Sequence, residues 1–141
     1  MPFHIISIGY ERRDITEFLE ILRCYKVQKV IDVREVPYSR RKDFRKNLLA
    51  SSLKSAGITY KHLQVAGNPF HKSKADIQNC LAKYTAYLLD NPEIIDAVVC
   101  ELSEGPVAFL CYERNHEECH RSVLLETISQ NGHEIEVTKV E

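Results

Sequence analysis

The sequence predicts a single α/β domain with three layers, in which helices cover both faces of a mainly parallel sheet of about five strands. Short apolar runs alternate along residues 1–141 with segments of helical periodicity, and this order is typical of parallel strands joined by helical crossovers. The chain length suits one ordinary domain, and no repeat or linker divides it. A hydrophobic fraction of 44% beside 28% charged residues is also that of a globular protein.

Five segments are predicted to be strands because they are short and apolar. They are residues 3–8, 30–33, 58–63, 107–110 and 135–140. The first run closes at Gly9 and is apolar throughout, as in strands buried on both faces of a sheet. The last alternates apolar with polar residues, which predicts a strand at the sheet edge.

Helical spacing fills the gaps between these strands. Asp14 and Glu17 form a pair typical of a helix start. Residues 43–56 have helical spacing, with Gly57 placed for a left-handed cap. Three more helices are predicted, over 77–88, from Pro92 to Leu102, and over 119–131. Residues 64–74, with a basic tail of His71, Lys72 and Lys74, have turn chemistry and predict a surface loop.

Composition narrows the partners and the location. No stretch approaches the roughly 18 apolar residues of a membrane span, and the N-terminus lacks the pattern of a signal peptide, so we expect a cytoplasmic protein without a membrane partner. Five cysteines without a Cys-x-x-Cys pair predict reduced thiols, of which Cys24, Cys80 and Cys100 look structural. A net charge of −1 gives no overall attraction for nucleic acid, so such binding would need a local patch.

Side chains able to do chemistry follow the strand ends, which in a parallel sheet share one edge with the ligand crevice. The segment 110–122 alone holds two thiols, two imidazoles, two guanidiniums and three carboxylates. The candidate catalytic residues are Cys111, Cys119, His120, Glu113 and Asp32. The candidate substrate-binding residues are Gly9, Tyr10, Arg34, Tyr38, Ser39, Arg40, His62 and Arg121. All of these are expected to reach one bound molecule in that crevice.

The leading hypothesis is a cysteine- and histidine-dependent enzyme acting on a small anionic or nucleotide-like substrate. Cys119 is predicted at a helix start, where the helix dipole favours a thiolate or a bound anion. The dipole contributes only about 0.3–1 kcal/mol at an exposed site, so an active thiolate also needs a cation such as His120 or Arg121. Arg34 and Arg121 would bind the anion, with Asp32 or Glu113 orienting them. The alternative to a catalytic role is a structural one, in which these residues serve only as core thiols, helix caps or ordinary ion pairs.

Two other classes of function stay open. A metal could bind Cys111, Cys119 and His120 or His116, since thiolate and imidazole suit zinc or iron, although no residue is assigned to a metal in the leading hypothesis and the cofactor is left open. The basic run Arg40–Lys46 could instead bind nucleic acid or a protein partner without catalysis. A solvated basic face is the simpler interpretation of that run. Oligomeric state is not predicted.

The motifs resemble a known family. Ser7-Ile8-Gly9-Tyr10, Ile31-Asp32-Val33-Arg34, Gly57 to Leu63 and Cys111-Tyr112-Glu113 with Cys119-His120-Arg121 are similar to those of domain of unknown function 488, in order and over nearly the whole chain. The resemblance implies a small bacterial or archaeal cytosolic protein. A partial likeness to rhodanese-type sulfurtransferases covers the Asp-Val-Arg strand and the later strand, Cys loop and helix. Three acids in that loop argue against persulfide chemistry there.

Overall fold

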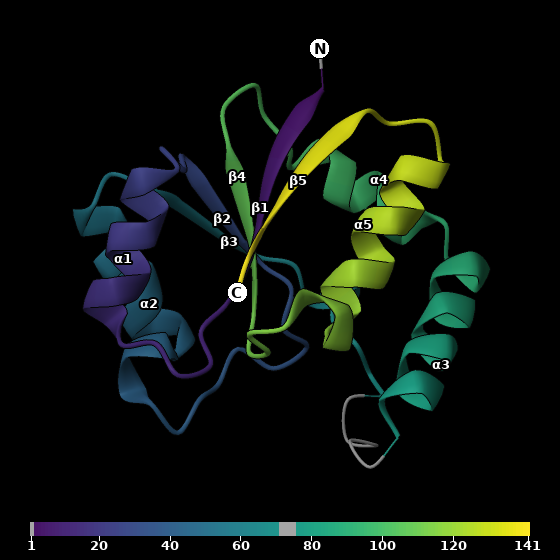
Figure 1. The fold of residues 1–141 in the computed structure, drawn as a ribbon, viewed down its shortest axis with the longest axis horizontal. Helices are drawn as coiled ribbons and strands as arrows, with labels where there is room; N and C mark the ends of the chain where they lie inside the picture. The colour runs from purple at the N-terminus through teal and green to yellow at the C-terminus, as the bar shows by residue number, and fades with distance from the viewer. Residues whose placement is uncertain (1, 71–75) are drawn as a thin grey trace.

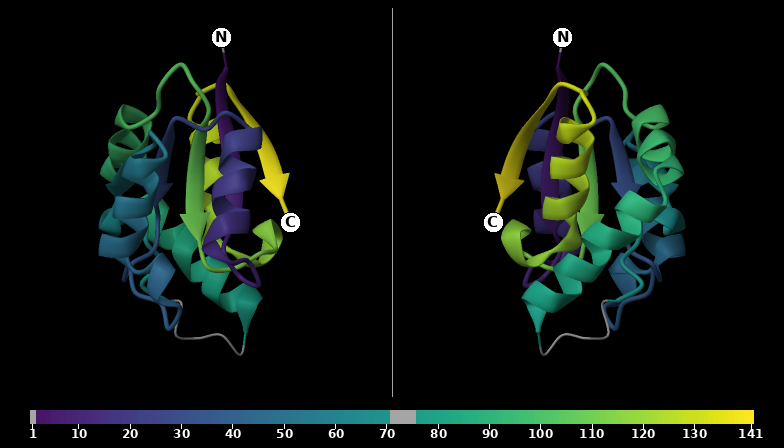
Figure 2. Two further views of the ribbon diagram at one scale, coloured as in Figure 1. Left: turned by 90° about the vertical axis from the view of Figure 1, so that its left-hand side faces the viewer. Right: turned by 90° about the vertical axis from the view of Figure 1, so that its right-hand side faces the viewer.

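The computed structural model describes residues 2–70 and 76–141 and confirms the predicted α/β class. Its sheet has five parallel strands in the order β3-β2-β4-β1-β5. They are β1 (Phe3–Gly9), β2 (Lys29–Asp32), β3 (Thr59–His62), β4 (Val107–Cys111) and β5 (Ile135–Val140). Strand β5 lies at an edge, as predicted. Every strand pairing is parallel, so the carboxyl ends of the strands share one edge, and the strand arrows visible in Figure 2 point the same way.

Helices cover the two faces of the sheet unequally (Figures 1 and 2). One face carries α1 (Ile15–Cys24) and α2 (Lys46–Ser55), and the other carries α3 (Ile77–Asp90), α4 (Glu93–Cys100) and α5 (His120–Gln130). Each face has its own apolar core. Successive strand residues alternate between the cores, so Ile5 packs toward α5 while Ile6 packs toward α1.

Local sequence explains where most helices begin and end. The Asp14 side chain accepts a hydrogen bond of 2.8 Å from the Glu17 backbone N–H at the start of α1, and Asp76 caps α3 in the same way. Gly57 and Gly132 have positive φ after α2 and α5, which is the left-handed conformation expected of residues that stop a helix. Cys119 is the N-cap of α5, as predicted.

The helix expected over residues 43–56 is interrupted. A 3-10 turn, Lys42–Phe44, comes first, Arg45 is extended, and α2 begins only at Lys46. The cause is that backbone groups here have partners outside the helix. The Phe44 carbonyl accepts from Arg34 Nη1 at 2.7 Å, and the Lys46 N–H donates to the Pro37 carbonyl.

The loop expected over residues 64–74 also contains a 3-10 turn, Gln64–Ala66. Its remaining described part, up to Phe70, has no further helix or strand. The basic tail of His71, Lys72 and Lys74 lies outside the described residues. Across residues 2–70 and 76–141, none of the helices has the length and apolar character that crossing a membrane would require.

Candidate functional site

The predicted site residues share the carboxyl edge of the sheet but divide between its two faces. Asp32 contacts Tyr60, and Arg34 contacts Tyr10 and Phe44, which belong to or border the core beneath α1 and α2. Cys111 and Cys119 belong instead to the core beneath α3, α4 and α5. The expectation of a single crevice is therefore corrected. The reason is the pleat, which sends the side chain of Asp32 to one face while the neighbouring Val33 points to the other.

On the α1 and α2 face, Asp32 and Arg34 form a buried ion pair, as the sequence suggested. Arg34 donates from Nε to Asp32 Oδ1 at 2.8 Å and from Nη2 to Oδ2 at 2.6 Å. The Tyr60 hydroxyl donates to Oδ2 at 2.6 Å, and burial followed by the Asp32 charge raises the pKa of Tyr60. With Nη1 of Arg34 turned to the Phe44 carbonyl, this guanidinium is largely occupied by protein groups. Its predicted role as an anion clamp stays a prediction.

On the opposite face, two thiols and an imidazole meet at the end of β4 and the start of α5. The Cys119 Sγ lies 3.6 Å from His120 Nδ1, and the Cys111 Sγ lies 3.9 Å from the same nitrogen. The three atoms all lie within 4.8 Å of one another, and all three residues are buried. We call these three residues the dithiol-imidazole cluster. It joins segments that the sequence predicted to act together.

The orientation of the His120 ring follows from its other contacts. Nε2 lies 2.8 Å from the Val33 carbonyl, which can only accept, so Nε2 carries a proton and donates it. The His120 and Tyr84 rings meet in a T-shaped contact with centroids 5.1 Å apart. Nδ1 is therefore held facing both sulfur atoms.

Arg121 is fully buried and donates from Nε to the Cys119 Sγ at 3.2 Å. Its Nη2 donates to the Glu113 carbonyl, and Nη1 has no hydrogen-bond partner among the described residues. No carboxylate within the described ranges forms a salt bridge with Arg121. Because a buried cation without a counter-charge is costly, the Cys119 sulfur is the acceptor positioned to supply negative charge.

These contacts move the pKa values of the cluster in opposite directions. Burial opposes ionisation of Cys119, but the hydrogen bond from Cys111 and the charges of Arg121 and His120 outweigh it and lower the pKa of Cys119. The pKa of Cys111 is raised by the same hydrogen bond and by burial. Burial lowers the pKa of His120, yet the neighbouring Cys119 more than reverses that effect. These directions favour ionisation of Cys119 over that of Cys111.

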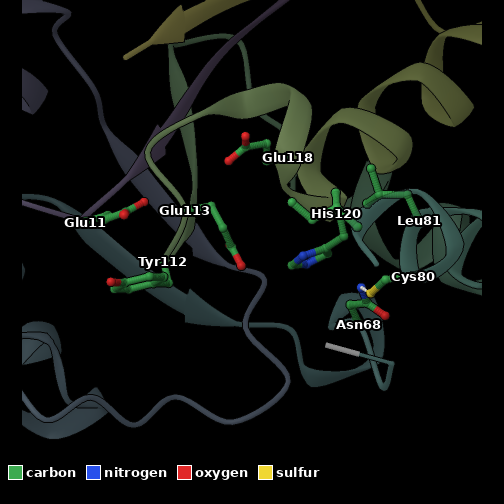
Figure 3. A pocket seen from close by; sticks show the side chains of 9 residues that line it. Glu11, Asn68, Cys80, Leu81, Tyr112, Glu113, Glu118 and His120 are labelled. Carbon is green, nitrogen blue, oxygen red and sulfur yellow. Dashed lines mark hydrogen bonds between the residues drawn. The ribbon is translucent and has the colours of Figure 1, made fainter. Parts of the chain in front are cut away.

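A cavity of about 200 Å³ opens beside the cluster (Figure 3). His120 and Glu113 form part of its wall, and Figure 3 shows their side chains pointing toward one another. Oε2 of Glu113 is buried without a hydrogen-bond partner in the described part of the chain. Burial and then the Cys119 charge raise the pKa of Glu113. The other lining residues are Glu11, Asn68, Ile77, Cys80, Leu81, Tyr112 and Glu118.

The remaining predicted binding residues support the loops around the site rather than line the cavity. Gly9 is buried, and a Cβ there would overlap the Glu113 carbonyl, so the glycine permits close approach of two backbones. Tyr10 stacks on Phe44 with centroids 4.5 Å apart. The Ser39 hydroxyl accepts from the Arg41 N–H, and His62 Nε2 lies 2.8 Å from the Arg34 carbonyl.

Part of the basic run is engaged by its own loop. Arg41 donates to the Tyr10 carbonyl at 3.0 Å and lies over the Phe44 ring. Arg45 donates to the Ser39 carbonyl at 2.8 Å and lies over the exposed ring of Tyr38. Arg40 is exposed. These contacts order the loop, so a structural role explains the presence of Arg41 and Arg45 without a nucleic-acid partner.

Several residues at the site were not predicted. Tyr60 and Tyr84, which hold Asp32 and the His120 ring, read as ordinary strand and helix residues in the sequence. Cys80 was predicted as a core residue of α3 and is buried, but it also lines the cavity. Cys24 and Cys100, expected to be structural, are exposed. The side chains of α3 reach the site only because α3 docks against α5, and the sequence gives no local signal of that docking.

Fold and site together define a parallel α/β protein with a buried cluster of two thiols and one imidazole beside a cavity. The profile of the family described as Domain of unknown function DUF488 matches residues 14–128, and the chain belongs to this family. The match includes every member of the cluster, as well as Asp32 and Arg34. Neither a curated protein nor a solved structure matches the chain. The likeness to rhodanese-type domains stays a prediction.

Proposed function

We propose that this chain is an enzyme whose reactive centre is the dithiol-imidazole cluster and whose substrate binds in the adjoining cavity. The observation that carries the proposal is the buried Cys119 sulfur, which lies within hydrogen-bonding reach of Arg121 Nε and near His120 Nδ1. Groups held so tightly around one sulfur favour its anionic form. The Cys119 sulfur does not itself line the cavity, so attack on an electrophilic carbon requires the substrate to reach it past His120 and Glu113.

Glu113 gives the site a group that can move protons. Its carboxyl group faces His120 in Figure 3 and forms part of the cavity wall. A carboxyl group whose pKa burial has raised is better suited to exchange a proton with a substrate than an ordinary exposed carboxylate is. Two routes then begin at this centre: direct attack by the Cys119 thiolate, or attack by water activated at the cluster. Both require the substrate to lie against His120 and Glu113.

The described cavity wall favours a neutral or positively charged substrate over an anion. It contains three carboxyl groups, from Glu11, Glu113 and Glu118, and no lysine or arginine among the residues described. Repulsion between two unit negative charges 4 Å apart is about 1 kcal/mol in water and about 4 kcal/mol near a protein surface. The expected anionic ligand gains no support from this wall. A small ester, amide or amino-substituted ring suits it better.

The first experiment measures hydrolysis of p-nitrophenyl acetate, a small neutral ester. We expect turnover by the wild-type chain and its loss in Cys119→Ser, because the reacting sulfur is removed. Glu113→Gln should lower the rate by about 10²- to 10⁴-fold, the usual contribution of a positioned acid or base. Cys24→Ser is the matched control, since Cys24 is exposed on α1 and far from the cluster in sequence. Its rate should equal that of the wild type.

A second measurement does not depend on choosing the right substrate. Protein treated with a chelator is alkylated with iodoacetamide at slightly acidic pH, and each cysteine is followed by peptide mass mapping. We expect Cys119 or Cys111 to react faster than the exposed Cys24 and Cys100, despite their burial. Preferential labelling of the two exposed cysteines, together with ester hydrolysis that is the same in Cys119→Ser, would refute the proposal.

A non-catalytic function in nucleic-acid binding rests only on the basic run and has less support. Two of its arginines make contacts within the loop, as described above. The remaining cations predict binding that weakens steeply with salt and persists in Cys119→Ser. A gel-shift titration of single-stranded DNA at two salt concentrations measures both properties.

A further inference from the structure

The geometry of the cluster points to a metal site: we propose that Cys111, Cys119 and His120 bind one divalent transition metal ion of the zinc class. This inference rests on the proposed function, because it names the cofactor that would act at the same centre. Two thiolates and one imidazole form a ligand set that zinc uses when a fourth position stays open for water or substrate. All three residues are buried, and their donor atoms converge on one point.

The two sulfur-to-nitrogen distances in the cluster are close to those that a tetrahedral ion imposes. With bonds of about 2.3 Å to sulfur and about 2.0–2.1 Å to nitrogen, the sulfur and nitrogen ligands of zinc lie about 3.6 Å apart. The two sulfur-to-nitrogen distances here are 3.6 Å for Cys119 and 3.9 Å for Cys111. The protein therefore spaces these atoms for a common ion.

The groups around the three ligands are those that a metal site requires. His120 donates its Nε2 proton to the Val33 carbonyl, which leaves the lone pair of Nδ1 for the ion and fixes the plane of the ring. Arg121 donates to the Cys119 sulfur and offsets the negative charge of the paired thiolates. Tyr84 blocks rotation of the ring from the side. A single catalytic cysteine does not require a second thiol directed at the same point, whereas a metal site does.

His120 is the member of the cluster that lines the cavity, and Glu113 lines it beside His120, so water or substrate would approach a bound ion from that side. Glu113 is not one of the convergent ligands and keeps a buried carboxyl oxygen without a partner among the described residues. It is placed to accept a proton from water or substrate at the open position. A metal ion there would supply water of lowered pKa, the chemistry of zinc enzymes with three protein ligands.

Elemental analysis of protein purified without added metal tests the site directly. We expect one equivalent of zinc or a neighbouring divalent metal per wild-type chain and per Cys24→Ser chain. Cys111→Ser, Cys119→Ser and His120→Asn should each retain less than about a tenth of that content, because two remaining ligands bind weakly. Retention of the metal in Cys119→Ser would place it elsewhere and overturn the proposal.

Cobalt titration of the chelator-treated wild type keeps the test valid if a variant fails to fold. We expect an intense thiolate-to-cobalt charge-transfer band and the visible bands of tetrahedral cobalt, saturating at one equivalent. A wild-type chain with neither metal nor cobalt bands refutes the site. An intact mass lower by two hydrogens, with the disulfide mapped to Cys111 and Cys119 by peptide mass analysis, refutes it as well. Ester turnover by the metal-free chain would support the enzyme proposal and contradict a role for the metal in it. A metal-loaded chain without turnover would support the metal site and contradict the enzyme proposal.

Discussion

Replacement of Asp32 by asparagine should destabilise the protein strongly while leaving the dithiol-imidazole cluster intact. Asp32 is fully buried and receives hydrogen bonds from Arg34 Nε, Arg34 Nη2 and the Tyr60 hydroxyl at 2.6–2.8 Å. The substitution keeps the shape of the side chain but leaves the buried Arg34 cation without its counter-charge. Breaking such a pair from one side costs about 3–5 kcal/mol. That is a large part of the 5–15 kcal/mol that typically separates folded from unfolded domains.

Urea unfolding followed by circular dichroism measures this loss as a lower transition midpoint at unchanged slope. Tyr60→Phe serves as a graded comparison, since it removes a single hydrogen bond to the carboxylate and should cost about 1.5–3 kcal/mol. Cobalt titration of the folded fraction of Asp32→Asn should match the wild type, because Asp32 lies on the other face of the sheet. A loss below about 1 kcal/mol would refute the assignment of a buried structural ion pair, and loss of the cobalt bands would refute the separation of the two faces.

Three further outcomes are expected. Burial, followed by the charge of Arg121, lowers the pKa of His116 in the folded protein below its ordinary value of 6.5. The stability that neutral His116 contributes is therefore complete above pH 6.5 and is lost as the pH falls through the pKa of the folded protein. Urea unfolding at several pH values should show that His116→Asn loses less stability in acid than the wild type does, and an unchanged profile would contradict this. Gly9→Ala should lower the melting temperature and the cobalt affinity together, because the new Cβ would displace the Glu113 backbone beside the cluster; an unchanged cobalt titration would refute that coupling. Gly57→Ala, at φ +77° in open space, should cost only about 1–2 kcal/mol of unfolding free energy and leave cobalt binding unchanged.

Local patterns were enough to predict the fold class and the start of α5 at Cys119. Apolar runs and helical spacing depend on neighbouring residues, so the five strands and most helices follow from them, and Asp14 and Gly57 mark helix ends in the sequence itself. The break at Arg45 could not be predicted in this way. It depends on hydrogen bonds from Arg34 and to Pro37, which lie eight or more residues away along the chain.

For the site, the sequence predicted the members but not how they group. Cys111, Cys119, His120 and Arg121 do meet, because the end of β4 and the start of α5 are joined by a short loop. Asp32 and Arg34 were expected to join them, since the edge of the sheet was predictable while the side-chain direction at the strand end was not. The cavity wall from α3 depends on tertiary docking, which no local pattern reports.

Asp32, the last residue of β2, and Val33, which follows it, have different partners: the Asp32 side chain accepts hydrogen bonds from Arg34, and the Val33 carbonyl accepts one from His120. One strand end is thus a common anchor for both halves of the molecule. An insertion or deletion of a single residue within β2 would exchange the two directions and disrupt the ion pair and the imidazole at once. Insertions, deletions and labels should therefore avoid this strand. Exposed residues beyond it, such as Val36 and Arg40, are better positions, because a change there does not reverse the direction of buried side chains.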